Sequence, residues 1–152
     1  MEMGMLAYED GKYYKAIQCF DREIKEDEIS KDAYLWRSLS KRMICNYEGA
    51  IADISKVIEI DPVDSSNYMV KGRIYMDAKM YENAIYSFKE SIAIVPDSGG
   101  SYFMLGVAYF EKGDYKKAMS AIDKAIDLGF AYEYVMKKRE EIRKGIKTYN
   151  DK

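Results

Sequence analysis

The sequence between residues 102 and 118 is YFMLGVAYFEKGDYKKA. Within it, Gly106 and Tyr109 precede Tyr115 and Ala118, and the same order of small and aromatic residues occurs 34 residues earlier. The same 34-residue interval separates successive members of a series of tyrosines along the chain, namely Tyr13, Tyr47, Tyr81 and Tyr115. A fixed period of this length is typical of stacked supersecondary units, so the chain is predicted to be a repeat protein.

Residues that recur every 34 positions form a column, and most columns keep one kind of side chain. Nine residues before each recurring tyrosine lies a small residue (Gly4, Ser38, Gly72, Gly106), and three residues after it lies an alanine (Ala16, Ala50, Ala84, Ala118). Four residues beyond each alanine comes a large apolar side chain (Phe20, Ile54, Phe88, Ile122). Small residues at two fixed places suit two backbones that approach closely, so we expect close helix pairs.

Each repeat is predicted to contain two helices. Apolar residues in the second half recur at three- and four-residue spacing, which is the pattern of an amphipathic helix, and the first half has the same pattern. Pro62 and Pro96 are expected to end second helices, and Gly113 falls in the turn within its repeat. Because Cys45 and Lys79 occupy the same column as Gly113, we expect that this turn does not need a positive φ. No segment is predicted to be a strand.

The 34-residue unit, with its small-x-x-aromatic motif followed by G-x-Y-x-x-A and a terminal proline, resembles the tetratricopeptide repeat family. The resemblance extends over four copies, from residue 1 to about residue 130. It implies an all-α fold, an α-solenoid that winds as a right-handed superhelix of four helix–turn–helix repeats of 34 residues plus a C-terminal capping helix. We expect one domain over 1–152, with repeats at approximately 1–30, 31–64, 65–98 and 99–130 and the capping helix at 131–148.

Three basic residues depart from the family pattern. Arg37 and Lys41 occupy columns that the family usually fills with Leu and Tyr, and Lys71 lies in the column of Arg37. Since an unpaired charge is costly at a repeat interface, we expect Glu23 to pair with Arg37 or Lys41. In the alternative, both basic side chains extend to solvent.

The segment after the fourth repeat is predicted to be an amphipathic helix. Its apolar stripe consists of Tyr132, Val135, Met136, Ile142 and Ile146. A solenoid needs a terminal helix with one polar face, and this segment meets that need. A helix at the membrane surface is the alternative, which the acidic residues of the segment disfavour.

Composition limits the classes of function. The formal net charge of −2 over 152 residues does not favour nucleic-acid binding. The sequence contains no transmembrane run and no signal peptide, so we expect a cytoplasmic protein without a membrane partner. Cys19 and Cys45 have no metal-ligand spacing, and two buried or half-buried thiols are expected there instead of a disulfide.

Catalysis is not predicted. The chain has no histidine, which excludes histidine-based triads and most zinc sites. Acidic pairs such as Glu140 and Glu141 lie on a helix face that we expect to be solvated. We therefore expect no enzyme activity and assign no catalytic, cofactor-binding or metal-binding residue.

Binding is predicted along the first helices, which line the concave side in such a stack. The first-helix residues that avoid the expected core stripe are mostly apolar and form a predicted peptide groove: Met5, Tyr8, Leu35, Trp36, Leu39, Arg42, Met43, Met69, Val70, Arg73, Met76, Phe103, Met104, Val107 and Phe110. Exposed apolar rows mark binding surfaces, and methionines adapt to different partner shapes. The prediction is a non-catalytic protein–protein interaction module or adaptor that takes an apolar or amphipathic peptide segment.

Within this predicted groove Trp36 is the expected anchor, and Arg42 and Arg73 are expected to meet an acidic flank of the partner. Two alternatives stay open: Trp36 belongs to the core, and the methionines pack between repeats. The family variant that grips C-terminal carboxylates of chaperone tails uses lysines and asparagines, and the corresponding positions here hold Met1, Met5, Trp36, Gly100 and Met104. We therefore expect no binding of chaperone tails.

Self-association is the second hypothesis. The first repeat begins with Met1, Met3, Met5 and Leu6 and has no polar cap. An apolar surface at that end would favour a homo-oligomer or scaffold.

Overall fold

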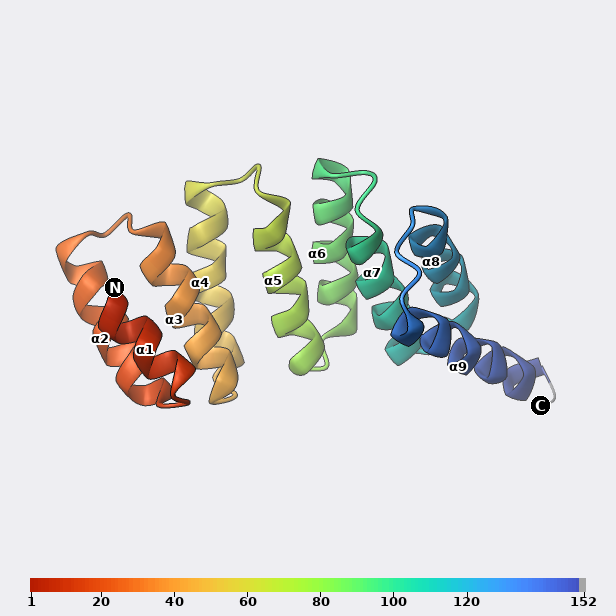
Figure 1. Cartoon of the computed structure of the whole chain (residues 1–152), viewed down its shortest axis with the longest axis horizontal. Helices are drawn as coiled ribbons and strands as arrows, with labels where there is room; N and C mark the ends of the chain where they lie inside the picture. The colour runs from red at the N-terminus through yellow and green to blue at the C-terminus, as the bar shows by residue number, and fades with distance from the viewer. Residues whose placement is uncertain (151–152) are drawn as a thin grey trace.

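The computed structural model describes residues 1–150, with side chains to residue 148, and this part of the chain contains α-helices and no strand. The helices follow one another along the long axis of the molecule (Figure 1). Their bounds are α1 (Glu2–Glu9), α2 (Tyr13–Glu26), α3 (Lys31–Met43), α4 (Tyr47–Ile60), α5 (Ser65–Asp77), α6 (Tyr81–Ile94), α7 (Gly99–Lys112), α8 (Tyr115–Asp127) and α9 (Glu133–Asn150). The predicted all-α solenoid is confirmed.

The helices form successive antiparallel pairs that stack. α1 packs against α2, α3 against α4, α5 against α6, and α7 against α8, while the second helix of each pair packs against the first helix of the next. In addition α1 contacts α3, and α7 contacts α9. A first helix therefore has neighbours on several sides, which limits how much of its surface reaches solvent.

The small-residue columns mark the closest approach within each pair. A Cβ atom added to Gly72 would lie 2.4 Å from Cε1 of Phe88, and one added to Gly4 would lie 2.5 Å from Cε1 of Phe20. Both phenylalanines are fully buried, as are the alanines of the recurring column. The glycines are thus required because the aromatic ring of the second helix lies against the backbone of the first.

The turn within each pair has a left-handed residue in every copy, so our expectation about this turn is wrong. The φ angles are 73° at Gly11, 59° at Cys45, 58° at Lys79 and 90° at Gly113. At the third turn the amide of Lys79 donates to Met76 O at 3.0 Å and the next amide donates to Tyr75 O at 2.8 Å, which is the Schellman arrangement that ends a helix. The hydrogen bonds of the cap impose the left-handed conformation even where the residue has a side chain.

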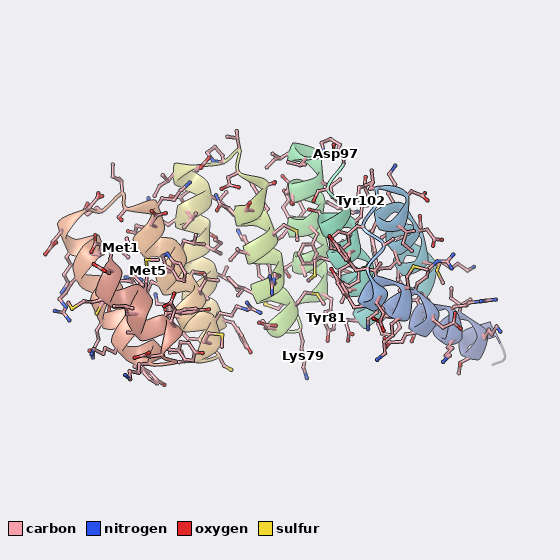
Figure 2. All side chains as sticks on the ribbon, viewed as in Figure 1. Met1, Met5, Lys79, Tyr81, Asp97 and Tyr102 are labelled. Carbon is pink, nitrogen blue, oxygen red and sulfur yellow. The ribbon has the colours of Figure 1, made fainter. Side chains whose placement is uncertain are left out.

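Replacing Lys79 with glycine is expected to raise the free energy of unfolding by about 0.5–1 kcal/mol. Figure 2 shows Lys79 at the turn between α5 and α6, and its side chain is exposed, so the substitution removes backbone strain without removing packing. Urea denaturation of both proteins measures the difference. Lys89→Gly within helix α6 is the opposite control, since glycine in a helix interior is destabilising.

The predicted helix ends between pairs agree with the structure. Helices α4 and α6 end two residues before Pro62 and Pro96. Asp64 accepts a hydrogen bond from Ser66 N, and Ser98 accepts one from Ser101 N, so both are N-caps.

Helix α9 packs on the last pair through part of its predicted stripe. Val135 and Ile142 are fully buried in a cluster with Ala118 and Ile122, and Ile146 packs against the same cluster. Tyr132, also predicted for the stripe, precedes α9 and is 57% exposed, and Met136 is 47% exposed because the buried face of the helix is narrower than the sequence pattern. No helix in residues 1–150 is long and apolar enough to cross a membrane.

Candidate functional site

Most residues of the predicted peptide groove pack against neighbouring helices. The half-buried members that contact a hydrophobic cluster are Met5, Tyr8 and Trp36 at the first pair, Leu35 and Val70 at the second, Met69, Met76 and Met104 at the third, and Phe103 and Phe110 at the fourth. Much of the apolar surface of the first helices is therefore in contact with neighbouring helices, both within a pair and between pairs.

The predicted anchor Trp36 lies at the junction of the first two pairs. Its ring meets the ring of Tyr8 edge to face, with centroids 5.3 Å apart, and it packs on the cluster of Ala7, Ala16 and Phe20. The side chain remains half-buried. Its position therefore combines inter-repeat packing with an exposed edge.

Helix α9 covers the C-terminal end of the predicted groove. The ring of Phe103 lies 5.3 Å from that of Tyr134, and Lys138 Nζ lies 4.8 Å from the centre of the Phe110 ring. These two phenylalanines were predicted to face a ligand, and each faces a side chain of α9 instead. The sequence pattern missed this because the helical period does not say where the terminal helix docks.

One column of the predicted groove avoids the hydrophobic clusters from the second repeat onward. It consists of Leu39, Arg73 and Val107, on α3, α5 and α7, and we call it the central row. Leu39 and Val107 are half-buried, whereas Arg73 is exposed. The central row places an exposed guanidinium between two apolar side chains on successive first helices.

The two arginines of the predicted groove differ in their partners. Arg42 forms an ion pair with Asp77, across from α3 to the end of α5. Arg73 forms no ion pair with any residue in the described part of the chain. Of the two, Arg73 is the one whose charge is available to an acidic partner.

The ionic contacts of Arg37 and Lys41 differ from our prediction. Arg37 donates to both carboxylate oxygens of Asp53, at 2.9 and 2.6 Å, and to Asp21 at 2.7 Å. Lys41 Nζ lies 2.8 Å from Asp53. Glu23 instead pairs with the terminal amine of the chain at 2.7 Å, so the expected Glu23 pair is wrong.

The second alternative, in which both basic side chains extend to solvent, is also wrong. Arg37 and Lys41 are only 16% and 17% exposed, and Asp53 is 5% exposed. The hydrogen bonds to Asp53 raise the pKa of Arg37 above its ordinary value, so the guanidinium is firmly charged. The role of Asp53 could have been recognised in the sequence, because the other residues in its column, Cys19, Ser87 and Ala121, are uncharged.

The thiols and acidic groups are not arranged for metal binding. Cys19 is half-buried and Cys45 is exposed, which corrects the expectation that both would be at least half-buried. Both are free thiols. Within residues 1–148, no three or more acidic or cysteine side chains are grouped in a way that would hold a metal ion.

The stacked helix pairs define the class of protein, an α-solenoid of the kind that presents extended surfaces to other proteins. Residues 72–113 match a family model described as TPR repeat, and residues 99–128 match one described as tetratricopeptide repeat. The chain therefore contains tetratricopeptide repeats, and the resemblance inferred from the columns is confirmed. Repeats of this family generally serve as non-catalytic modules of protein–protein interaction.

Solved structures share the fold over most of the chain. A crystal structure of the MamA protein is 23% identical and superposes with a TM-score of 0.75 over 97% of this chain and 86% of its own. A thermophilic TPR protein of Thermus thermophilus is 18% identical, with a TM-score of 0.73 over 96% of this chain and 80% of its own. The Sgt2 TPR domain of Aspergillus fumigatus is 19% identical, with a TM-score of 0.73 over 80% of this chain and 82% of its own.

No curated protein sequence matches this chain significantly. At these identities the structural likeness concerns the fold alone.

Proposed function

We propose that this protein is a non-catalytic interaction module that binds an apolar or amphipathic peptide segment along its first helices. The observation that carries the proposal is the central row of Leu39, Arg73 and Val107, which presents apolar surface and, within the described residues, an unpaired cation on successive repeats. Such a row suits a segment with an acidic residue between two apolar ones. The partner is therefore a protein with a short acidic and apolar segment.

Selection from a library of random displayed peptides tests this proposal. The wild-type protein is expected to enrich peptides in which Asp or Glu lies between apolar residues, and Arg73→Glu is expected to remove the acidic preference or invert it. The matched control is Lys116→Glu, which changes the same charge on an exposed part of α8. An acidic preference that survives in Arg73→Glu would contradict the proposal.

Replacing Trp36 with alanine is expected to lower the free energy of unfolding by about 2 kcal/mol, roughly half the cost of truncating a fully buried aromatic residue. The expected loss comes from the contacts with Tyr8 and the first hydrophobic cluster. Urea denaturation measures stability, and titration with a selected peptide measures affinity. A large loss of affinity at unchanged stability would instead make Trp36 a peptide anchor, as the sequence pattern indicated.

Self-association is the second candidate function, favoured by exposed apolar side chains on α1. Met3 and Leu6 are 68% and 55% exposed. Light scattering at two protein concentrations tests it, since a homo-oligomer grows with concentration. A monomer at both concentrations would exclude self-association. If an oligomer forms, the double variant Met3→Lys, Leu6→Lys is expected to dissociate it.

A further inference from the structure

A cavity of about 370 Å³ lies between the two helices of the third pair, away from the predicted groove. Its lining combines aromatic, amide, hydroxyl and charged side chains, from Tyr68, Lys71 and Tyr75 on α5 and Glu82, Asn83, Tyr86 and Ser87 on α6. Cavities of this size suit small ligands or single side chains. The distinctive feature of this cavity is that its lysine, Lys71, is half-buried and forms no ion pair within the described residues.

Lys71 occupies the column of Arg37 but lacks the carboxylates that accompany Arg37. The residues in the columns of Asp21 and Asp53 are Ser55 and Ser87. Around Arg37 the two aspartates, Asp21 on α2 and Asp53 on α4, bind the guanidinium at 2.6–2.9 Å. In the third repeat a basic residue is kept, and both of its acidic partners are replaced by serine.

The amine of Lys71 is therefore partly desolvated without a compensating anion. It forms no ion pair within the described residues, and its side chain is half-buried. Burial lowers the pKa of Lys71 below its ordinary value, which is the expected sign for an ammonium group that loses water and gains no negative neighbour.

The carboxylate in the lining does not supply this missing partner. Glu82 is paired with Lys112 of the next helix pair, at 2.5 Å, and is largely exposed. Ser87, only 2% exposed, donates its hydroxyl to Asn83 O at 2.9 Å, and Tyr68 donates its hydroxyl to Pro62 O at 3.2 Å. The polar groups around the lysine are thus either engaged or uncharged.

We propose that this cavity binds a carboxylate attached to an aromatic or apolar body. Lys71 provides the charge-assisted hydrogen bond to the carboxylate, and the rings of Tyr68, Tyr75 and Tyr86 provide the surface against which the body packs. The ligand replaces the internal carboxylate that the second repeat has and the third lacks. A free organic acid and the C-terminal residue of a peptide share this chemistry.

The fourth repeat offers an internal reference for this assignment. A cavity of about 370 Å³ lies at the equivalent place between α7 and α8, where Leu105 replaces Lys71 and Ala121 replaces Ser87. Its wall is apolar at these two positions, and the two lysines of its lining, Lys117 and Lys124, are exposed on α8. Lys71→Leu introduces the residue that the fourth repeat has in this column, and Ser87→Asp introduces the residue that the second repeat has in its column. Both substitutions therefore use residues that already occur at the equivalent positions of this chain.

The experiment titrates 15N-labelled protein with benzoate, with N-acetylphenylalanine and with neutral benzyl alcohol, followed by backbone amide NMR. We expect both acids to shift signals of α5 and α6, with a Kd on the order of 1 mM for benzoate, and the alcohol to bind at least about tenfold more weakly. Tighter binding of N-acetylphenylalanine assigns the site to peptide C-termini, and tighter binding of benzoate assigns it to free acids.

The variants decide whether Lys71 is responsible. Lys71→Leu is expected to weaken both acids at least about tenfold, and Ser87→Asp is expected to do the same by pairing with Lys71. Lys116→Leu, which removes an exposed lysine of α8, is expected to leave binding unchanged. Equal affinity of wild type and Lys71→Leu, absence of binding to either acid, or shifts outside α5 and α6 would overturn the proposal. None of these outcomes bears on the first-helix surface, since Arg73→Glu tests that separately.

Discussion

Replacing Asp53 with alanine is expected to lower the free energy of unfolding by about 3–5 kcal/mol. The substitution leaves Arg37 and Lys41 as two half-buried cations without the carboxylate that both contact. Breaking a buried ion pair from one side is costly because the remaining charge loses its partner and does not regain full hydration. Urea or thermal unfolding followed by circular dichroism measures the loss.

Asp21 provides the matched control for this prediction. It also binds Arg37, but it is 45% exposed, so Asp21→Ala is expected to cost no more than about 1 kcal/mol. Equal effects of Asp21→Ala and Asp53→Ala would contradict the assignment of Asp53 as the central group.

A triple variant distinguishes the destabilisation caused by removing one ionic partner from the net contribution of the intact charge cluster to the free energy of unfolding. The fourth repeat has Leu105, Tyr109 and Ala121 where the second has Arg37, Lys41 and Asp53. Arg37→Leu, Lys41→Tyr and Asp53→Ala together are expected to restore the stability that Asp53→Ala alone removes, because an apolar cluster replaces the ionic one without desolvating any charge. If the triple variant is as unstable as the single one, the loss has another origin.

Replacing Phe88 with alanine is expected to lower the free energy of unfolding by about 3–5 kcal/mol. Phe88 is fully buried in the cluster of the third pair, where its ring lies against the backbone of Gly72. Removing the ring leaves a cavity that the glycine cannot fill, since it has no side chain. The shift of the urea midpoint at an unchanged slope measures the effect.

Phe88→Ile is the control, because Ile54 and Ile122 occupy the same column in neighbouring repeats. It is expected to cost clearly less than Phe88→Ala, and adding Gly72→Ser should then be tolerated, as Ser38 and Ile54 hold these two columns in the second repeat. In the presence of Phe88 the same serine should be destabilising by about 1–3 kcal/mol, because its Cβ would overlap the ring. Additive effects of the two substitutions would mean that the ring and the glycine do not contact each other.

Most of the fold could be predicted from the sequence, because each feature depends on neighbours at short or regular spacing. The helix pairs, the helix ends before Pro62 and Pro96 and the close contact at Gly72 all follow from local pattern and column identity. The left-handed turns at Cys45 and Lys79 could not, since their side chains give no sign of the conformation that the cap imposes.

The candidate site was less predictable than the fold. The columns located the first-helix stripe, but they did not separate Leu39 and Arg73, which avoid the clusters, from Trp36 and Met69, which pack against hydrophobic clusters. They also identified Lys71 as unusual without revealing that it lines a cavity.

The period, the helix pairs and most residues of the core can be derived from the sequence alone, because a 34-residue repeat places residues of similar packing role in the same column. Which charges pair and which apolar side chains are covered became clear from the packing of the helices. Asp53 pairs with Arg37 and Lys41, Glu23 does not, and α9 covers Phe103. The physical reason is that exposure and pairing depend on the side chains of two or three adjacent helices together, whereas a column describes one position of one helix.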